Sequence, residues 1–126
     1  MNIRLVSIEQ DGIVRLAANG SMTASEMASD DRHPLANVIG DRWASNRVVL
    51  SLSQAEYLDS TAIGWLLSCK KQFDREGGIF VLHSTPPSVK QIFDLLKVDR
   101  VLAMAPDEEQ ALEMARSAAQ QGHEDA

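Results

Sequence analysis

Cysteine is nearly absent from the sequence, which has Cys69 alone among 126 residues. One cysteine cannot form a disulfide within the chain, and it cannot complete a metal site by itself. The class of small secreted domains held together by disulfides is therefore excluded. Because Cys69 lies among apolar positions of a predicted helix, we expect it to serve as a small buried hydrophobic side chain.

Long apolar runs are also missing. No run approaches the roughly 20 residues that span a bilayer. Residues 1–10 alternate polar and apolar side chains, so they lack the apolar block of a signal peptide. We therefore predict a cytoplasmic protein with no direct insertion into a membrane.

Positive charge is scarce, because 12 Lys and Arg stand against 18 Asp and Glu and give a formal net charge of −6. The acidic excess is concentrated in residues 107–126, which hold six acidic side chains and one basic side chain. Such a chain lacks the positive surface that binds phosphate backbones, so we predict no nucleic-acid partner. The acidic end is typical of a solubilising tail.

The residue patterns of catalysis are missing as well. His33, His83 and His123 are scattered, no set of residues has metal-ligand spacing, and no phosphate-binding glycine loop is present. We predict no catalytic residue, no metal and no cofactor. A small hydrolase that uses Ser60 as its nucleophile is a third interpretation, but the glycines of a hydrolase elbow do not flank that serine.

What the sequence does contain is an alternation of strand-like and helix-like segments. Runs of period two or of β-branched residues predict strands, and apolar positions three and four residues apart predict helices. An N-terminal hairpin followed by alternating helices and strands predicts an α/β fold, in which a mixed sheet of four or five strands packs with about four helices. We expect one domain over residues 1–119 and a frayed acidic tail at residues 120–126. The predicted strands are 3–8, 13–17, 47–52, 79–83 and 101–104, and the predicted helices are 34–44, 60–76, 88–96 and 107–119.

Three polar stretches complete the chain. Residues 19–34 and 53–57 are interpreted as connections, with a short helix that begins at Thr23 inside the first of them. Residues 84–88 connect a buried strand to the next helix, which Ser88 is expected to cap.

The junction between the third strand and its helix, residues 58–64 (LDSTAIG), holds a carboxylate and two hydroxyls. The first turn of a helix has unpaired N–H groups and a positive dipole end, so it favours capping side chains and also phosphate. Such a junction lies at the carboxyl edge of a parallel sheet, where functional surfaces form, and residues 84–88 are expected next to it. This position makes a purely capping role for the hydroxyls less favoured but leaves it open.

Trp65 follows on the same helix, next to Gly64 and away from the apolar positions of its main seam. An exposed Trp beside a phosphorylatable hydroxyl would suit a partner surface. The other interpretation is a Trp at the edge of the core.

These segments together resemble the STAS domains, the sulfate transporter and anti-sigma factor antagonist modules. The resemblance covers residues 2–117 and rests on five segments that occur in the family's order: 48–52, 58–67, 77–82, 87–96 and 107–112. It implies a stand-alone binding module without catalytic activity of its own. Only together with this family resemblance does the position of the junction favour Asp59 as the cap and Ser60 presented outward, while Thr61 is either a second modification target or a cap.

The resemblance also implies a mechanism and a set of contact residues. In anti-sigma factor antagonists the serine after the aspartate, here Ser60, is phosphorylated by an anti-sigma factor that is also a serine kinase, and a phosphatase resets it. The unphosphorylated form binds the anti-sigma factor. An unphosphorylated subunit of a membrane transporter or signalling scaffold is the alternative. The residues expected to contact the partner are Asp59, Thr61, Ala62, Gly64, Trp65, Ser21, Met22 and Thr23.

Overall fold

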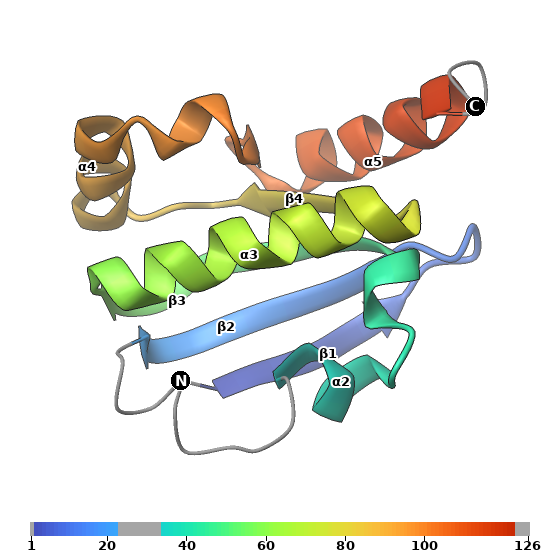
Figure 1. The fold of residues 1–126 in the computed structure, drawn as a ribbon, viewed down its shortest axis with the longest axis horizontal. Helices are drawn as coiled ribbons and strands as arrows, with labels where there is room; N and C mark the ends of the chain where they lie inside the picture. The colour runs from blue at the N-terminus through green and yellow to red at the C-terminus, as the bar shows by residue number, and fades with distance from the viewer. Residues whose placement is uncertain (1, 23–33, 123–126) are drawn as a thin grey trace.

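The computed structural model describes residues 2–22 and 34–122 of the chain, and its elements alternate as the pattern predicts (Figure 1). The strands are β1 (Asn2–Ile8), β2 (Val14–Met22), β3 (Arg47–Leu58), β4 (Ile79–His83) and β5 (Ala103–Ala105). The α-helices are α2 (Pro34–Ile39), α3 (Ser60–Glu76), α4 (Pro87–Leu96) and α5 (Glu108–Gly122), and two 3-10 turns are η1 (Trp43–Ser45) and η2 (Val98–Arg100).

The strands of the described residues form one five-stranded sheet in the order β1-β2-β3-β4-β5. β1 pairs with β2 in antiparallel fashion, which confirms the N-terminal hairpin, and each later neighbour pairs in parallel. The sheet is therefore mixed, as predicted, because only the first connection is short enough for a hairpin.

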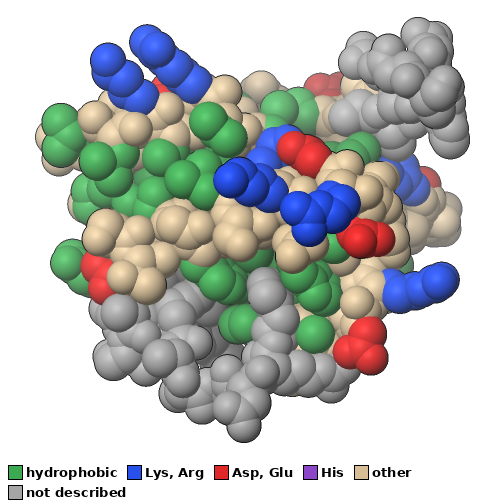
Figure 2. Space-filling model, in the orientation of Figure 1, with side chains coloured by type: hydrophobic (Ala, Val, Ile, Leu, Met, Phe, Trp, Pro, Cys, Tyr) green, Lys and Arg blue, Asp and Glu red, His purple; other side chains and the backbone are tan. Residues whose placement is uncertain are grey.

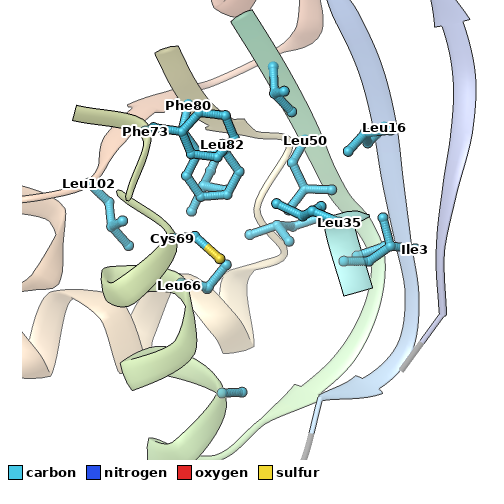
Figure 3. Packing of buried hydrophobic residues seen from close by; sticks show 14 of the residues in the cluster. Ile3, Leu16, Leu35, Leu50, Leu66, Cys69, Phe73, Phe80, Leu82 and Leu102 are labelled. Atoms are coloured by element: carbon cyan, nitrogen blue, oxygen red, sulfur yellow. The ribbon is translucent and has the colours of Figure 1, made fainter. Parts of the chain in front are cut away.

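Helices cover both faces of this sheet. On one face α2, α3, α4 and the two 3-10 turns bury a large apolar cluster against β2 and β3, shown in Figure 3. Within it Phe73 of α3 stacks on Phe80 of β4, with ring centroids 4.8 Å apart. On the other face α5 buries Ala111 and Ala115 against β3 and β4. Cys69 lies in the first cluster as a buried free thiol, and burial raises its pKa, which confirms its role as a small apolar side chain.

One glycine is required by this packing. A Cβ on Gly78 would collide with the backbone carbonyl oxygens of Ala44 and Asn46, because the chain between α3 and β4 passes directly against the chain that leads into β3. The N–H of Ile79 donates to the Asn46 carbonyl across the same contact. The glycine pair at the end of α3 thus ends the helix at Gly77 and permits the close approach at Gly78.

Two strands extend beyond their predicted ends. β2 continues from the predicted end at 17 to Met22, and β3 continues from 52 to Leu58, so the interpretation of residues 53–57 as a loop is wrong. The two strands stay paired as a ribbon up to Met22 and Leu58. Between the pairs Ala17–Ser51 and Ser21–Tyr57, β3 contributes two residues more than β2, so it carries two bulges.

The helical boundaries also differ from the prediction in places. α2 ends at Ile39 instead of near 44, because Gly40 has a φ of 92° and a 3-10 turn follows. α4 begins at Pro87 after Pro86, so Ser88 is not its cap. β5 begins two residues later than predicted, after η2, and α5 continues to Gly122. The short helix expected to begin at Thr23 lies outside the described residues, as do residues 123–126.

Candidate functional site

The predicted site is built around the first turn of α3. Asp59 has extended backbone geometry, and its Oδ1 accepts a hydrogen bond from the Ala62 N–H at 2.9 Å. The Asp59 carbonyl oxygen accepts the N–H of Ile63 at 3.1 Å, which starts the helical hydrogen-bond series. Asp59 is therefore the N-cap of α3, in agreement with the sequence analysis.

The residues after the cap divide between solvent and core. Ser60, Thr61 and Gly64 are exposed, whereas Ala62 and Ile63 are buried against the sheet. The two hydroxyls therefore stand on the outer side of the first turn. Ala62 cannot present its side chain to a partner, so any contribution it makes to binding comes through the backbone of this turn.

The structure of Trp65 agrees in part with each of the two interpretations, the exposed contact residue and the residue at the edge of the core. It is half-buried and packs against the large apolar cluster, while part of its ring remains accessible. It is a core-edge residue whose accessible side lies one helical turn from Thr61.

The end of β2 lies next to the first turn of α3. This is the arrangement expected if residues of both segments contact the same partner. Ser21 pairs with Tyr57 and Met22 pairs with Leu58, directly before Asp59. The two strand ends therefore lie side by side at the beginning of α3 (Figure 1). Thr23, the next predicted contact residue, lies outside the described residues.

Residues 84–88 follow the end of β4 and lead into α4, which packs in the same apolar cluster as the end of β3 and the beginning of α3 (Figure 1). The last pair between β3 and β4 is Ser51–His83, and β3 runs seven residues further, to Leu58. At about 3.3 Å per residue that extension is roughly 20 Å long. The carboxyl edge of the sheet is thus stepped, because β2 and β3 continue past β4.

This step also separates His83 from Ser60. His83 ends β4 in a buried position, and its Nδ1 lies 2.9 Å from the hydroxyl of its neighbour Ser84. Burial lowers the pKa of the imidazole. His83 pairs in the sheet with Ser51, nine positions before Ser60, so it is not placed to act as a general base on that serine.

Few charges lie in the first turn of α3. The first turn of α3 contains no acidic or basic residue after the Asp59 cap. In Figure 2 the Lys and Arg side chains over α3 lie toward its middle and C-terminal end, and hydrophobic side chains gather where α4 and the beginning of α3 lie. The surface around the hydroxyls therefore combines helix N–H dipoles with apolar neighbours.

Tyr57 is the residue at this site that sequence reasoning missed. Its side chain is 53% exposed, and it stands beside Ser21 three positions before Ser60. The sequence around Tyr57 does not show the alternation of a strand, because the bulges in β3 hide it. An exposed aromatic residue directly before the motif is the signal that could have found it.

No helix among the described residues is long and apolar enough to cross a membrane. No group of three or more His, Cys, Asp and Glu side chains in the described ranges is arranged to hold a metal ion.

Known proteins share this architecture. A candidate anti-sigma factor antagonist of Thermotoga maritima is 26% identical over 98 residues, which cover 75% of this chain and 87% of the relative. A crystal structure of a candidate antagonist from the same organism has a TM-score of 0.74 at 23% identity and covers 87% of this chain and 92% of that chain.

Two structures of the anti-sigma factor antagonist SpoIIAA also match, one in its unphosphorylated form and one, from Bacillus, in its phosphorylated form. Their TM-scores are 0.60 and 0.58 at 13% and 14% identity, and each match covers about nine-tenths of this chain and 98% of the other. At this identity the two structures support the fold alone. The family model described as the STAS domain matches residues 4–111, and the chain therefore belongs to the STAS domain family.

Proposed function

We propose that this protein is an anti-sigma factor antagonist whose binding to its partner is switched off by phosphorylation of Ser60. The observation that carries the proposal is the exposed Ser60 hydroxyl at the first residue of α3, directly after a cap supplied by Asp59. The relative from Thermotoga maritima carries the name of an antagonist, and SpoIIAA has been solved in both phosphorylation states. The partner would be an anti-sigma factor with serine kinase activity, and a phosphatase would restore the unphosphorylated form.

The fold can accept a phosphate at this position without rearranging. A phosphoserine carries about −1.5 to −2 charges near neutral pH. At the N-terminus of a helix the macrodipole and the unpaired N–H groups stabilise such a charge. Asp59 already uses one oxygen on the Ala62 N–H, so it opposes the phosphate less than an uncapped carboxylate would.

The partner complex would respond differently. A doubly charged, hydrated group at the centre of an interface must either be desolvated or be matched by cations of the partner. A penalty of roughly 3 kcal/mol lowers affinity more than a hundredfold. The switch can therefore operate through the interface alone, with the contact surface formed by Asp59, Thr61, the backbone at Ala62 and Gly64, the accessible side of Trp65, and the β2 end at Ser21 and Met22.

The acceptor assignment is tested by intact-mass measurement after incubation with ATP and a kinase-type anti-sigma factor, for which a neighbouring gene is the first choice. We expect one added phosphate on the natural chain and on Thr61→Ala, and none on Ser60→Ala. A phosphate that persists in Ser60→Ala would contradict the assignment. Stable binding of the natural chain without any transfer of phosphate would instead support the alternative, an unphosphorylated STAS subunit of a transporter or scaffold.

A further inference from the structure

A second candidate site lies on the face of the sheet opposite α3, in a cavity of about 480 Å³. α5 covers β3 and β4 on this face, and the cavity opens beside the beginning of α5, over β1, β2 and β3. Its lining is mainly polar and includes Arg15, Asn19, Ser51, Ser53, Gln54 and His83.

Two neighbouring residues at this cavity, His83 and Ser84, have features that are uncommon in the rest of the described structure. His83 is the only polar or charged side chain among the described residues that is fully buried, at 4% exposure. Its neighbour Ser84 has a φ of 58° and is one of two described residues other than glycine with a positive φ. Native chains tolerate such costs chiefly where they serve a function.

The wall of the cavity that β2 and β3 form shows two further uncommon features. The side-chain oxygen Oδ1 of Asn19 is buried and has no hydrogen-bond partner in the part of the chain that the structure describes. One bulge of β3 lies between the pairs Ala17–Ser51 and Asn19–Gln54, so it forms part of the same wall. Bulges are frequent next to binding sites because they re-aim side chains. Here the hydroxyls of Ser51 and Ser53 lie 3.0 Å apart at the bulge.

Arg4 is an exposed residue of the lining, whereas the half-buried cation of the lining, Arg15, is compensated by carboxylates. The Arg15 Nε donates to a carboxylate oxygen of Glu108, in the first turn of α5, and Arg15 also lies 3.7 Å from Glu9. Burial lowers the pKa of His83, which favours its neutral form. Apart from the Arg15–Glu108 pair, the buried and half-buried polar groups that face the cavity are therefore the Asn19 amide, the hydroxyls of Ser51 and Ser84 and a neutral imidazole. Such groups recognise an uncharged ligand that both donates and accepts hydrogen bonds.

We propose that this cavity binds a small uncharged polyol, such as a sugar or a cyclitol. The hydroxyl groups of a polyol can donate to Asn19 Oδ1 and accept from Ser51, Ser53 or Gln54. No Phe, Tyr or Trp is among the described residues that line the cavity, so this lining offers no stacking surface of the kind that holds nucleobases. The site is separate from Ser60 and goes beyond the switch proposed above.

The test is a titration of the ¹⁵N-labelled full chain, unphosphorylated, with myo-inositol and with D-glucose at millimolar concentrations, followed by amide chemical shifts. We expect saturable shifts in residues 17–19, 51–54 and 83–84 with at least one of the two polyols. Asn19→Leu should weaken this binding by at least about tenfold, because it removes the buried acceptor. Ser53→Ala, a smaller change at the exposed rim, should weaken it too.

The controls separate this site from a general effect and from the Ser60 switch. Ser68→Ala, an exposed position on α3, and Ser60→Ala should both leave the affinity unchanged. Three outcomes would overturn the proposal. They are the absence of shifts of these amides with either polyol, an affinity of both Asn19→Leu and Ser53→Ala equal to that of the natural chain, and binding of adenosine in place of both polyols. Each would leave phosphorylation of Ser60 untouched.

Discussion

Asp59 and Ala62 are joined by a 2.9 Å hydrogen bond from the Ala62 N–H to the Asp59 carboxylate, and this bond connects the end of β3 to the first turn of α3. It fixes the backbone on either side of Ser60 and Thr61, so the two hydroxyls project from a rigid turn instead of a mobile loop. Because Asp59 supplies the cap, neither hydroxyl is needed for that purpose.

The loss of stability on substitution of Asp59 should therefore depend on whether the new side chain keeps a hydrogen-bond acceptor. We expect Asp59→Ala to lower the free energy of unfolding by about 1 kcal/mol, the usual cost of a lost N-cap. Asp59→Asn keeps an oxygen acceptor at the same place and should lie within a few tenths of a kcal/mol of the natural chain. Urea unfolding of the three proteins measures both differences. Equal losses in the two variants would show that the negative charge, and not the hydrogen bond, is the important property.

Two glycines should respond to alanine in opposite directions. Gly64 lies inside α3 with open space where a Cβ would stand, so Gly64→Ala should raise the free energy of unfolding by about 0.5–1 kcal/mol through helix propensity. A Cβ on Gly78 would collide with the Ala44 and Asn46 carbonyls, which belong to backbone and cannot move aside. We expect Gly78→Ala to cost about 1–3 kcal/mol or more. Thermal unfolding monitored by circular dichroism would reveal the sign of each change.

His83 should make stability depend on pH. Burial lowers its pKa in the folded state below the ordinary value of 6.5, so the unfolded chain binds more protons when the pH falls below that value. The folded state should therefore lose stability as the pH drops from 6.5 through the folded pKa. The slope from one group cannot exceed about 1.4 kcal/mol per pH unit. Comparison of unfolding curves of the natural chain and His83→Gln over this range isolates the effect, and parallel pH profiles would contradict it.

The regular parts of the fold follow directly from the sequence. Two kinds of local pattern are readable. A strand buried on both faces is a short apolar run, such as residues 79–83, and a helix buried on one face has apolar residues at helical spacing, such as Ile63, Leu66 and Phe73. The second half of β3 could not be recognised in this way. Its buried residues Leu52, Ala55 and Leu58 repeat every three positions, since each bulge inserts one residue and shifts the face that the next side chain occupies.

The candidate site divides in the same way: its local features can be predicted from the sequence, and its long-range contacts cannot. The Asp59 cap and the exposed Ser60 depend on the local geometry of a strand–helix junction, which the sequence carries. The placement of Ser21 beside Tyr57 depends on long-range pairing in an irregular ribbon, and no local pattern encodes it. For the same reason no local pattern shows how far β3 continues beyond β4, because the bulges hide that length.

Tyr57 should contribute to partner binding if the proposed switch is correct. Its half-exposed ring stands beside Ser21 at the end of the ribbon, and aromatic residues of this kind frequently dominate interfaces. We expect Tyr57→Ala to weaken binding of the unphosphorylated chain to its anti-sigma factor by about tenfold or more. Tyr57→Phe keeps the ring and should retain most of the affinity. Calorimetric titration measures both, and Ile8→Ser, at an exposed apolar position on β1, is the matched control for loss of surface hydrophobicity.

Charge at Ser60 should control the same complex. Ser60→Ala cannot be phosphorylated and removes only an exposed hydroxyl, so we expect it to bind the anti-sigma factor constitutively with near-natural affinity. Ser60→Asp places one charge at the position of the phosphate, and its binding should be at least about tenfold weaker. Thr61→Asp, one residue further along the turn, tests whether the effect belongs to the position or to any added charge. Equal affinities of Ser60→Ala and Ser60→Asp would contradict the electrostatic switch, because the fold itself accommodates a negative group at this helix end.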